Sequence, residues 1–64
     1  MNPTSIRTQI DEVERELEQR ERVYPRLVSQ GKLRQSQADY RMQQMQAVLQ
    51  TLLKLQEADH ARGS

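Results

Sequence analysis

The segment VYPRLVSQGKL, residues 23–33, divides this chain into two long arms with helical periodicity. Pro25 has no amide hydrogen to donate, and its ring clashes with the carbonyl four residues earlier. Tyr24, the residue before it, is biased away from helix, and Gly31 readily adopts the left-handed conformation that ends helices. We therefore expect the first helix to end or kink near Tyr24. A short helical turn from Pro25, closed by Gly31, then forms part of a hinge over residues 25–35, and the pattern leaves open whether this turn continues the first helix.

The first arm, residues 3 to about 24, has the apolar spacing of a coiled-coil helix. Its apolar side chains recur at steps of four and three, with one position skipped at Arg20 or Glu21. Two apolar positions in seven make a narrower stripe than the face of an ordinary globular helix. This stripe, which suits helix pairing, consists of Ile6, Ile10, Val13, Leu17 and Tyr24.

The second arm, residues 36 to about 60, carries a wider apolar face. The steps of four and three again describe a seam, and further apolar residues flank it between Val48 and Leu55. A single narrow partner helix cannot cover the whole face, so a lone hairpin would expose an apolar patch. The seam residues are Ala38, Met42, Met45, Leu49 and Leu52, and the flanking residues are Val48, Leu53 and Leu55.

Both arms begin with recognisable capping residues. Asn2-Pro3 is a favourable start for the first helix, because Asn caps free amide groups and Pro fits the first helical position. Thr4 or Ser5 is the alternative cap. In the second arm, Ser36 opens an S-x-x-D pattern that is similar to a capping box, and Gln35 is the alternative first residue.

These features predict an all-α protein: one domain, residues 1–64, folded as an antiparallel two-helix hairpin. A chain of 64 residues without cysteine has little core and no disulfide, and small domains of this kind are commonly stabilised by a partner chain. We expect a homodimer in which two hairpins form a four-helix bundle, with a larger assembly or docking on a different protein as the alternative. The expected core and dimer seam comprises Ile6, Ile10, Val13, Leu17, Met42, Met45, Val48, Leu49, Leu52 and Leu55.

No motif in the sequence indicates catalysis, a metal site or a cofactor. Asp59 and His60 are adjacent and point in different directions on a helix, and zinc sites need further Cys or His ligands that are missing here. Glu14 and Glu18 share a helix face, but such pairs are common in Glu-rich helices. Met42 and Met45 fit core filling better than an adaptable docking surface. We expect a protein that is not an enzyme and that uses no cofactor.

The charges are distributed unevenly along the chain. Residues 11–21 hold six acids and two arginines, about −4, whereas residues 22–41 hold five basic residues and one acid, about +4. Acid-to-base pairs four apart, which stabilise helices, are expected at Asp11–Arg15, Glu16–Arg20 and Glu18–Arg22. The hairpin gathers the basic residues at its hinge end. That tip either binds an anion or acidic partner or simply complements the helix dipole; its residues are Arg22, Arg26, Lys32, Arg34 and Arg41, with Tyr24, and Tyr40 beside them.

Residues 12–52 resemble short bacteriophage and prophage proteins that share the pattern E-x-E-L…R-x-x-V-Y-P…V…G-K-[LM]…A-D…M…M-x-A-V-L. The resemblance implies a phage source and no particular activity. Similar proteins often place Ser or Thr directly after G-K-[LM], where it would cap the second helix, and Arg34 stands there in this chain. The matching residues are Glu14, Glu16, Leu17, Arg20, Val23, Tyr24, Pro25, Val28, Gly31, Lys32, Leu33, Ala38, Asp39, Met42, Met45, Ala47, Val48 and Leu49.

We expect the chain to act in the cytoplasm, that of the host cell if it is phage-encoded, because it has no apolar run long enough to span a bilayer and no signal-peptide pattern at its N-terminus. The leading hypothesis is a non-enzymatic protein that binds a host or phage protein, since very small phage proteins often inhibit host regulators. A nucleic-acid accessory protein that uses the basic tip is one alternative. A structural piece of a phage assembly is another.

Overall fold

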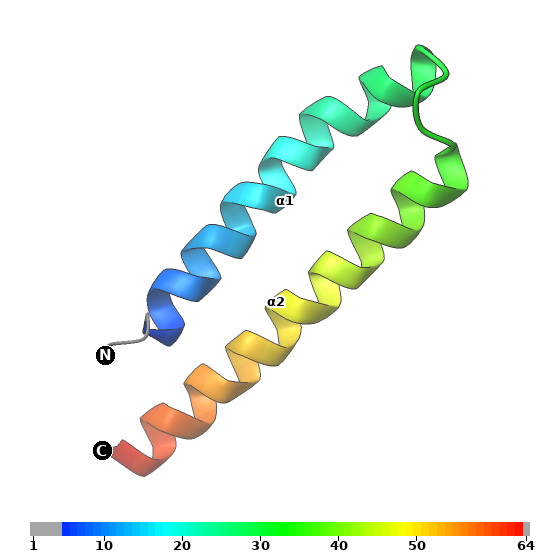
Figure 1. Cartoon of the computed structure of the whole chain (residues 1–64). Coiled ribbons are helices and arrows are strands. Elements are labelled where there is room, and N and C mark those ends of the chain that lie inside the picture. Colours follow the sequence, from blue (N-terminus) through cyan, green and yellow to red (C-terminus); the bar gives the residue numbers. More distant parts are fainter. Residues whose placement is uncertain (1–4, 64) are drawn as a thin grey trace.

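The computed structural model describes residues 5–63 of the chain, with side-chain surroundings for residues 5–60. Two helices, α1 (Ile6–Ser29) and α2 (Gln35–Gly63), run antiparallel and pack side by side, and they bring both ends of the chain to the same end of a rod (Figure 1). The rod measures 49 × 21 × 17 Å. The described residues contain no strand, so the predicted all-α hairpin is confirmed.

Helix α1 begins at the cap that the sequence offered as an alternative, Ser5. The Ser5 hydroxyl accepts a hydrogen bond from the Thr8 amide at 3.2 Å, and the Thr8 hydroxyl donates to the Ser5 carbonyl at 2.9 Å. The first of these bonds satisfies one of the amide groups that the first turn of a helix leaves free. The predicted start at Asn2-Pro3 lies outside the described residues.

Helix α1 does not end near Tyr24, as the proline suggested, but continues through Pro25 to Ser29. The fixed φ of proline is itself helical, and the main loss is one hydrogen bond to the carbonyl of Glu21. Both Pro25 and Glu21 are exposed, so water can solvate that carbonyl. The predicted end at residue 24 is therefore wrong. The predicted helical turn after Pro25 is present, and it is the last part of α1, a continuity that the sequence left open.

The end of α1 is a Schellman motif centred on Gly31. The Gly31 amide donates to the Val28 carbonyl at 3.0 Å, and the Lys32 amide donates to the Leu27 carbonyl at 2.9 Å. Gly31 has a φ of +74°, in the left-handed region that this motif requires. The predicted role of Gly31 as the helix terminator is confirmed. The actual reversal of the chain occupies only residues 30–34.

Helix α2 starts at Gln35, the alternative start, and not at Ser36. The Arg34 carbonyl accepts from the Ala38 amide at 3.0 Å, and the Gln37 side chain accepts from the Arg34 amide at 3.1 Å. Gln37 thus supplies half of a capping box, with Arg34 at the cap position. The predicted S-x-x-D box is wrong, because Asp39 instead accepts a hydrogen bond from the Gln35 side chain at 2.9 Å. The helix extends to Gly63, beyond the predicted end near residue 60.

The core between the helices is thin. Among residues 5–60, Ile10 is completely buried, and Leu33 and Ala38 are the other buried apolar residues. Leu33 lies in the chain reversal, at the hinge end. Within the predicted core and dimer seam, Val48 and Leu55 are exposed, so they do not belong to the core of the single hairpin. The remaining seam residues are half-buried: Ile6, Val13, Leu17, Met42, Met45, Leu49 and Leu52.

Within the described residues, neither helix has the combination of length and apolarity that crossing a bilayer requires.

Candidate interaction surface

Arg20 ties the two helices together near the hinge. Its Nη1 donates to the backbone carbonyl of Arg41 on α2 at 3.0 Å, and its Nε donates to the Glu16 carboxylate at 2.9 Å. The guanidinium carbon also lies 5.7 Å from the centroid of the Tyr24 ring, within the range of a cation–π contact. The Arg20 side chain is only 21% exposed. The position that sequence analysis left as a gap in the apolar stripe therefore holds a polar bridge between the helices.

Sequence reasoning missed this role, although a signal was present. Arg20 occupies a seam position, with an acid four residues before it and a tyrosine four residues after it. A polar residue at a seam position commonly sets the register of paired helices. The acceptor on the other helix is a backbone carbonyl, however, and no sequence pattern identifies which carbonyl that will be.

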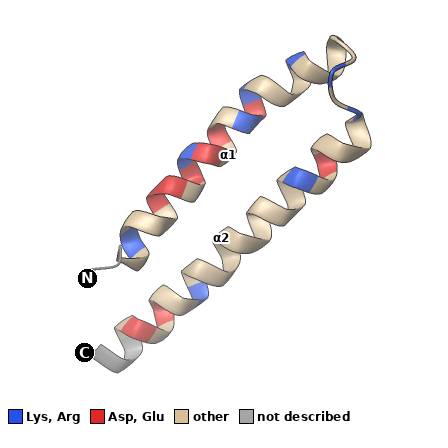
Figure 2. Ribbon diagram, in the orientation of Figure 1, with Lys and Arg blue, Asp and Glu red and all other residues tan. Residues whose placement is uncertain are grey.

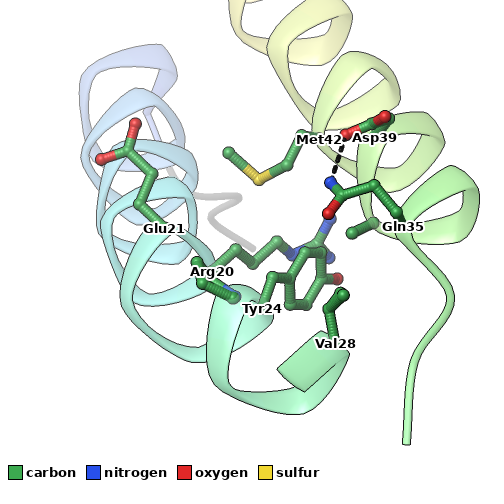
Figure 3. A pocket seen from close by; sticks show the side chains of 9 residues that line it. Arg20, Glu21, Tyr24, Val28, Gln35, Asp39 and Met42 are labelled. Atoms are coloured by element: carbon green, nitrogen blue, oxygen red, sulfur yellow. Dashed lines mark hydrogen bonds between the residues drawn. The ribbon is translucent and has the colours of Figure 1, made fainter. Parts of the chain in front are cut away.

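A groove lies beside this bridge, between the helices at the hinge end. It has a volume of about 250 Å³, and Figure 3 shows Tyr24 and Val28 on the α1 side and Met42 on the α2 side. The hydrogen bond from Gln35 to Asp39 forms part of its α2 wall (Figure 3). Its walls are mainly apolar and present no nucleophile next to a base. The full lining is Arg20, Glu21, Tyr24, Pro25, Val28, Gln35, Ala38, Asp39 and Met42.

The acidic band of α1 is partly neutralised by arginines of the same helix. Asp11 pairs with Arg7 at 3.1 Å, and Glu12 pairs with Arg15 at 2.9 Å, so the predicted Asp11–Arg15 pair is wrong. The Glu16–Arg20 pair is confirmed. The predicted Glu18–Arg22 pair does not form among the described residues. Among the acids of α1, Glu14, Glu18 and Glu21 have no ion pair within the described residues.

In contrast to the acidic α1, the middle of helix α2 is uncharged. Residues 42–53 contain no charged side chain, and Figure 2 shows this length of α2 without basic or acidic colour, whereas α1 carries a band of acids. Val48 is 46% exposed and Leu55 51% exposed, and both lie off the seam that faces α1. We name their row the outer stripe: it consists of Gln44, Val48, Thr51 and Leu55, at steps of four, three and four, all exposed.

A second groove, of about 240 Å³, borders the outer stripe on the side of Arg20. Gln44 and Val48 of the stripe line it, together with Met45 of the seam. The exposed ring of Tyr40 lies at the same groove, beside Arg41. The surface of α2 around Val48 is therefore hollowed and uncharged, with Arg20 and Arg41 at its hinge end.

The predicted basic tip is open to solvent. All five of its basic residues are exposed, and Figure 2 shows basic positions around the hinge end. Arg41 lines the groove beside the outer stripe, and the Arg34 backbone caps α2. Tyr24 is half-buried, and its ring is already in contact with Arg20, so it is not a free stacking platform.

Among the described residues, no group of three or more His, Cys, Asp or Glu side chains is arranged to hold a metal ion.

Comparison of the chain with protein-family models, with curated proteins and with solved structures finds no match. The resemblance to short phage proteins therefore stays a prediction.

Proposed function

We propose that this chain is a non-enzymatic interaction protein, a homodimeric helical hairpin that binds another protein. The observation that supports it best is the imbalance between core and surface. Ile10, Leu33 and Ala38 are the buried apolar residues among residues 5–60, whereas Val48, Leu55 and Tyr40 are all more than 45% exposed. Apolar side chains that one partner helix leaves in water favour association with a further surface.

The first test is the mass of the protein in solution. Light scattering at micromolar concentration should give twice the chain mass of 7.6 kDa. A monomer at that concentration would contradict the homodimer. Circular dichroism of the same sample checks that the chain is helical, so that an unfolded monomer is not mistaken for a folded one.

The partner in this proposal is a protein of the host or of the phage, and the resemblance of residues 12–52 to phage proteins supports that source. Affinity capture from phage-infected cells, compared with uninfected cells, tests it. The matched control is the Val48→Glu variant, which places a charge on the outer stripe. A protein retained by the natural chain and lost with the variant supports a partner that needs this surface or the dimer.

A second candidate function is nucleic-acid binding by the basic tip, supported by the exposure of its five basic side chains around the hinge. Binding of this kind weakens steeply as salt is raised, because phosphate contacts release counterions. Simultaneous replacement of Arg26, Lys32 and Arg34 by Ala should abolish it. If the natural chain binds neither DNA nor RNA at low salt, this candidate is removed.

A further inference from the structure

We infer that the outer stripe of α2 is the surface on which a second copy of this chain docks, and that the two hairpins lie antiparallel. The hinge of each copy is then beside the open end of the other. This inference rests on the homodimer proposed above. It adds which face is used and which way the two rods point.

The chain exposes more surface than a compact protein of its mass, and the excess is about the area that one partner buries in a dimer. The chain exposes 5162 Å². A compact folded protein of 7.6 kDa is expected to expose about 4,300 Å². The excess, about 900 Å², is close to the roughly 800 Å² that each partner buries in a standard interface. A second hairpin laid along the rod would cover an area of this order.

The charges select α2, and not α1, as the helix at the interface. Helix α1 presents Glu14, Glu18 and Glu21 without ion-pair partners among the described residues. Bringing them against their own copies would place like charges together and remove them from water, which is unfavourable. The middle of α2, residues 42–53, has no charge to desolvate. An α2–α2 contact also keeps the two acidic bands on the outer sides of the bundle.

The outer stripe has the arrangement that a two-fold contact requires. Such a contact uses the same patch on both copies. We place the two-fold axis at Val48, so that Val48 meets Val48 of the second copy when two α2 helices run antiparallel. Gln44 then lies beside Thr51 of that copy, where an amide and a hydroxyl can form hydrogen bonds. At the next step, the aliphatic part of Arg41 covers Leu55 of the second copy.

The orientation follows from the basic hinge. Residues 22–41 carry about +4, from five basic side chains and one acid. Parallel hairpins would place two such ends within about 20 Å, two helix diameters. Antiparallel hairpins separate them by several Debye lengths, each about 8–10 Å at physiological salt.

The distance between the two hinges tests the orientation directly. The chain has no cysteine, so a Ser29→Cys variant carries a unique spin label at an exposed position at the end of α1. Gln35 precedes Val48 by 13 residues, about 20 Å at the helical rise of 1.5 Å, so antiparallel hinges lie about 40 Å apart.

Pulsed dipolar spectroscopy on the labelled protein has three outcomes. A distance near 40 Å supports the inference. A distance below about 25 Å means parallel hairpins and overturns the inference, while the homodimer stands. Absence of dipolar coupling, together with the mass of a monomer, removes the homodimer itself and with it the proposed function.

Two matched variants test the face. Val48→Glu and Gln50→Glu each add one negative charge to an exposed position of α2, but only the first lies in the outer stripe. Val48→Glu should weaken dimerisation at least 100-fold, and Gln50→Glu should change it less than threefold. Equal effects of the two variants overturn the assignment of the face.

Cysteine crosslinking keeps this test decisive if the Val48→Glu chain fails to fold. On mild oxidation, Val48→Cys should form a disulfide with its own copy much faster than Gln50→Cys, because a position on the two-fold axis meets itself. Equal rates for the two variants exclude the outer stripe as the interface.

Discussion

At the residue scale, Arg20 determines how the two arms are joined. Its guanidinium bonds a carbonyl of α2, an acid of α1 and the face of a tyrosine ring, so one side chain orders atoms from both helices. A leucine at this position would extend the apolar stripe, but it would not distinguish one axial register of α2 from another. The directional bond to Arg41 does distinguish them.

Replacement of Arg20 by Ala should lower the free energy of unfolding by about 1.5 kcal/mol, since a hydrogen bond made by a charged group and a cation–π contact are both lost. The measurement is urea unfolding followed by circular dichroism at fixed protein concentration. Arg22→Ala is the control: Arg22 is exposed, and its change should stay within about 0.5 kcal/mol. Equal effects of the two replacements would show that Arg20 does not bridge the helices.

At the scale of the element, the reversal of the chain depends on backbone conformation. The left-handed φ at Gly31 allows the Gly31 and Lys32 amides to reach carbonyls of the last turn of α1. Pro25 lies inside α1, six residues before Gly31, without ending the helix. Pro25 and Gly31 are both residue types that often end helices. Only Gly31 has a backbone conformation that an α-helix cannot contain, so Gly31 ends α1 and Pro25 does not.

Gly31→Ala should destabilise the hairpin by about 1 kcal/mol, the cost of a left-handed conformation in a residue with a Cβ. No heavy atom lies within 4 Å of the position that the new Cβ would take, so the effect is conformational and involves no clash. Thermal unfolding checks the prediction, with Ser29→Ala as a neighbouring control that should stay within about 0.5 kcal/mol. Unchanged stability in Gly31→Ala would mean that the turn adopts another conformation.

Pro25→Ala should stabilise the protein by about 1–2 kcal/mol, because the new amide can donate to the Glu21 carbonyl, offset in part by the greater freedom of the unfolded chain. Urea unfolding gives the magnitude. The hairpin itself should persist, as judged by the mass and helicity of the variant, since Gly31 terminates α1. Loss of stability or of the native mass would instead show that the proline is needed to shape the hinge.

At the scale of the whole molecule, a core this thin links folding to association. If the folded hairpin exists mainly as a dimer, mass action makes its melting temperature depend on protein concentration. A tenfold increase in concentration should raise the melting temperature by several degrees, measured by circular dichroism between about 5 and 50 μM. A melting temperature that is the same at all concentrations would indicate a hairpin that is stable alone.

The parts of the fold that the sequence predicted are those set by short-range interactions. The steps of four and three identified both helices and most of the inner seam, and Gly31 identified the end of α1. The errors concern places where two signals competed within a few residues: Pro25 against the continuing helix, and Ser36 against Gln35 at the start of α2. For the candidate surface, the excess of apolar residues on α2 was visible in the sequence. Which of them point outward was not.

The sequence by itself determined that this chain forms an antiparallel helical hairpin with an acidic first arm and an uncharged stretch in the second. Periodicity, capping and charge act between residues a few positions apart, so the linear order of the chain contains them. Only the tertiary structure decided that Arg20 crosses to the Arg41 carbonyl, 21 residues away, and that Val48 and Leu55 remain in solvent. Both outcomes depend on the rotation and axial offset of one helix against the other, which the packing of the two helices sets.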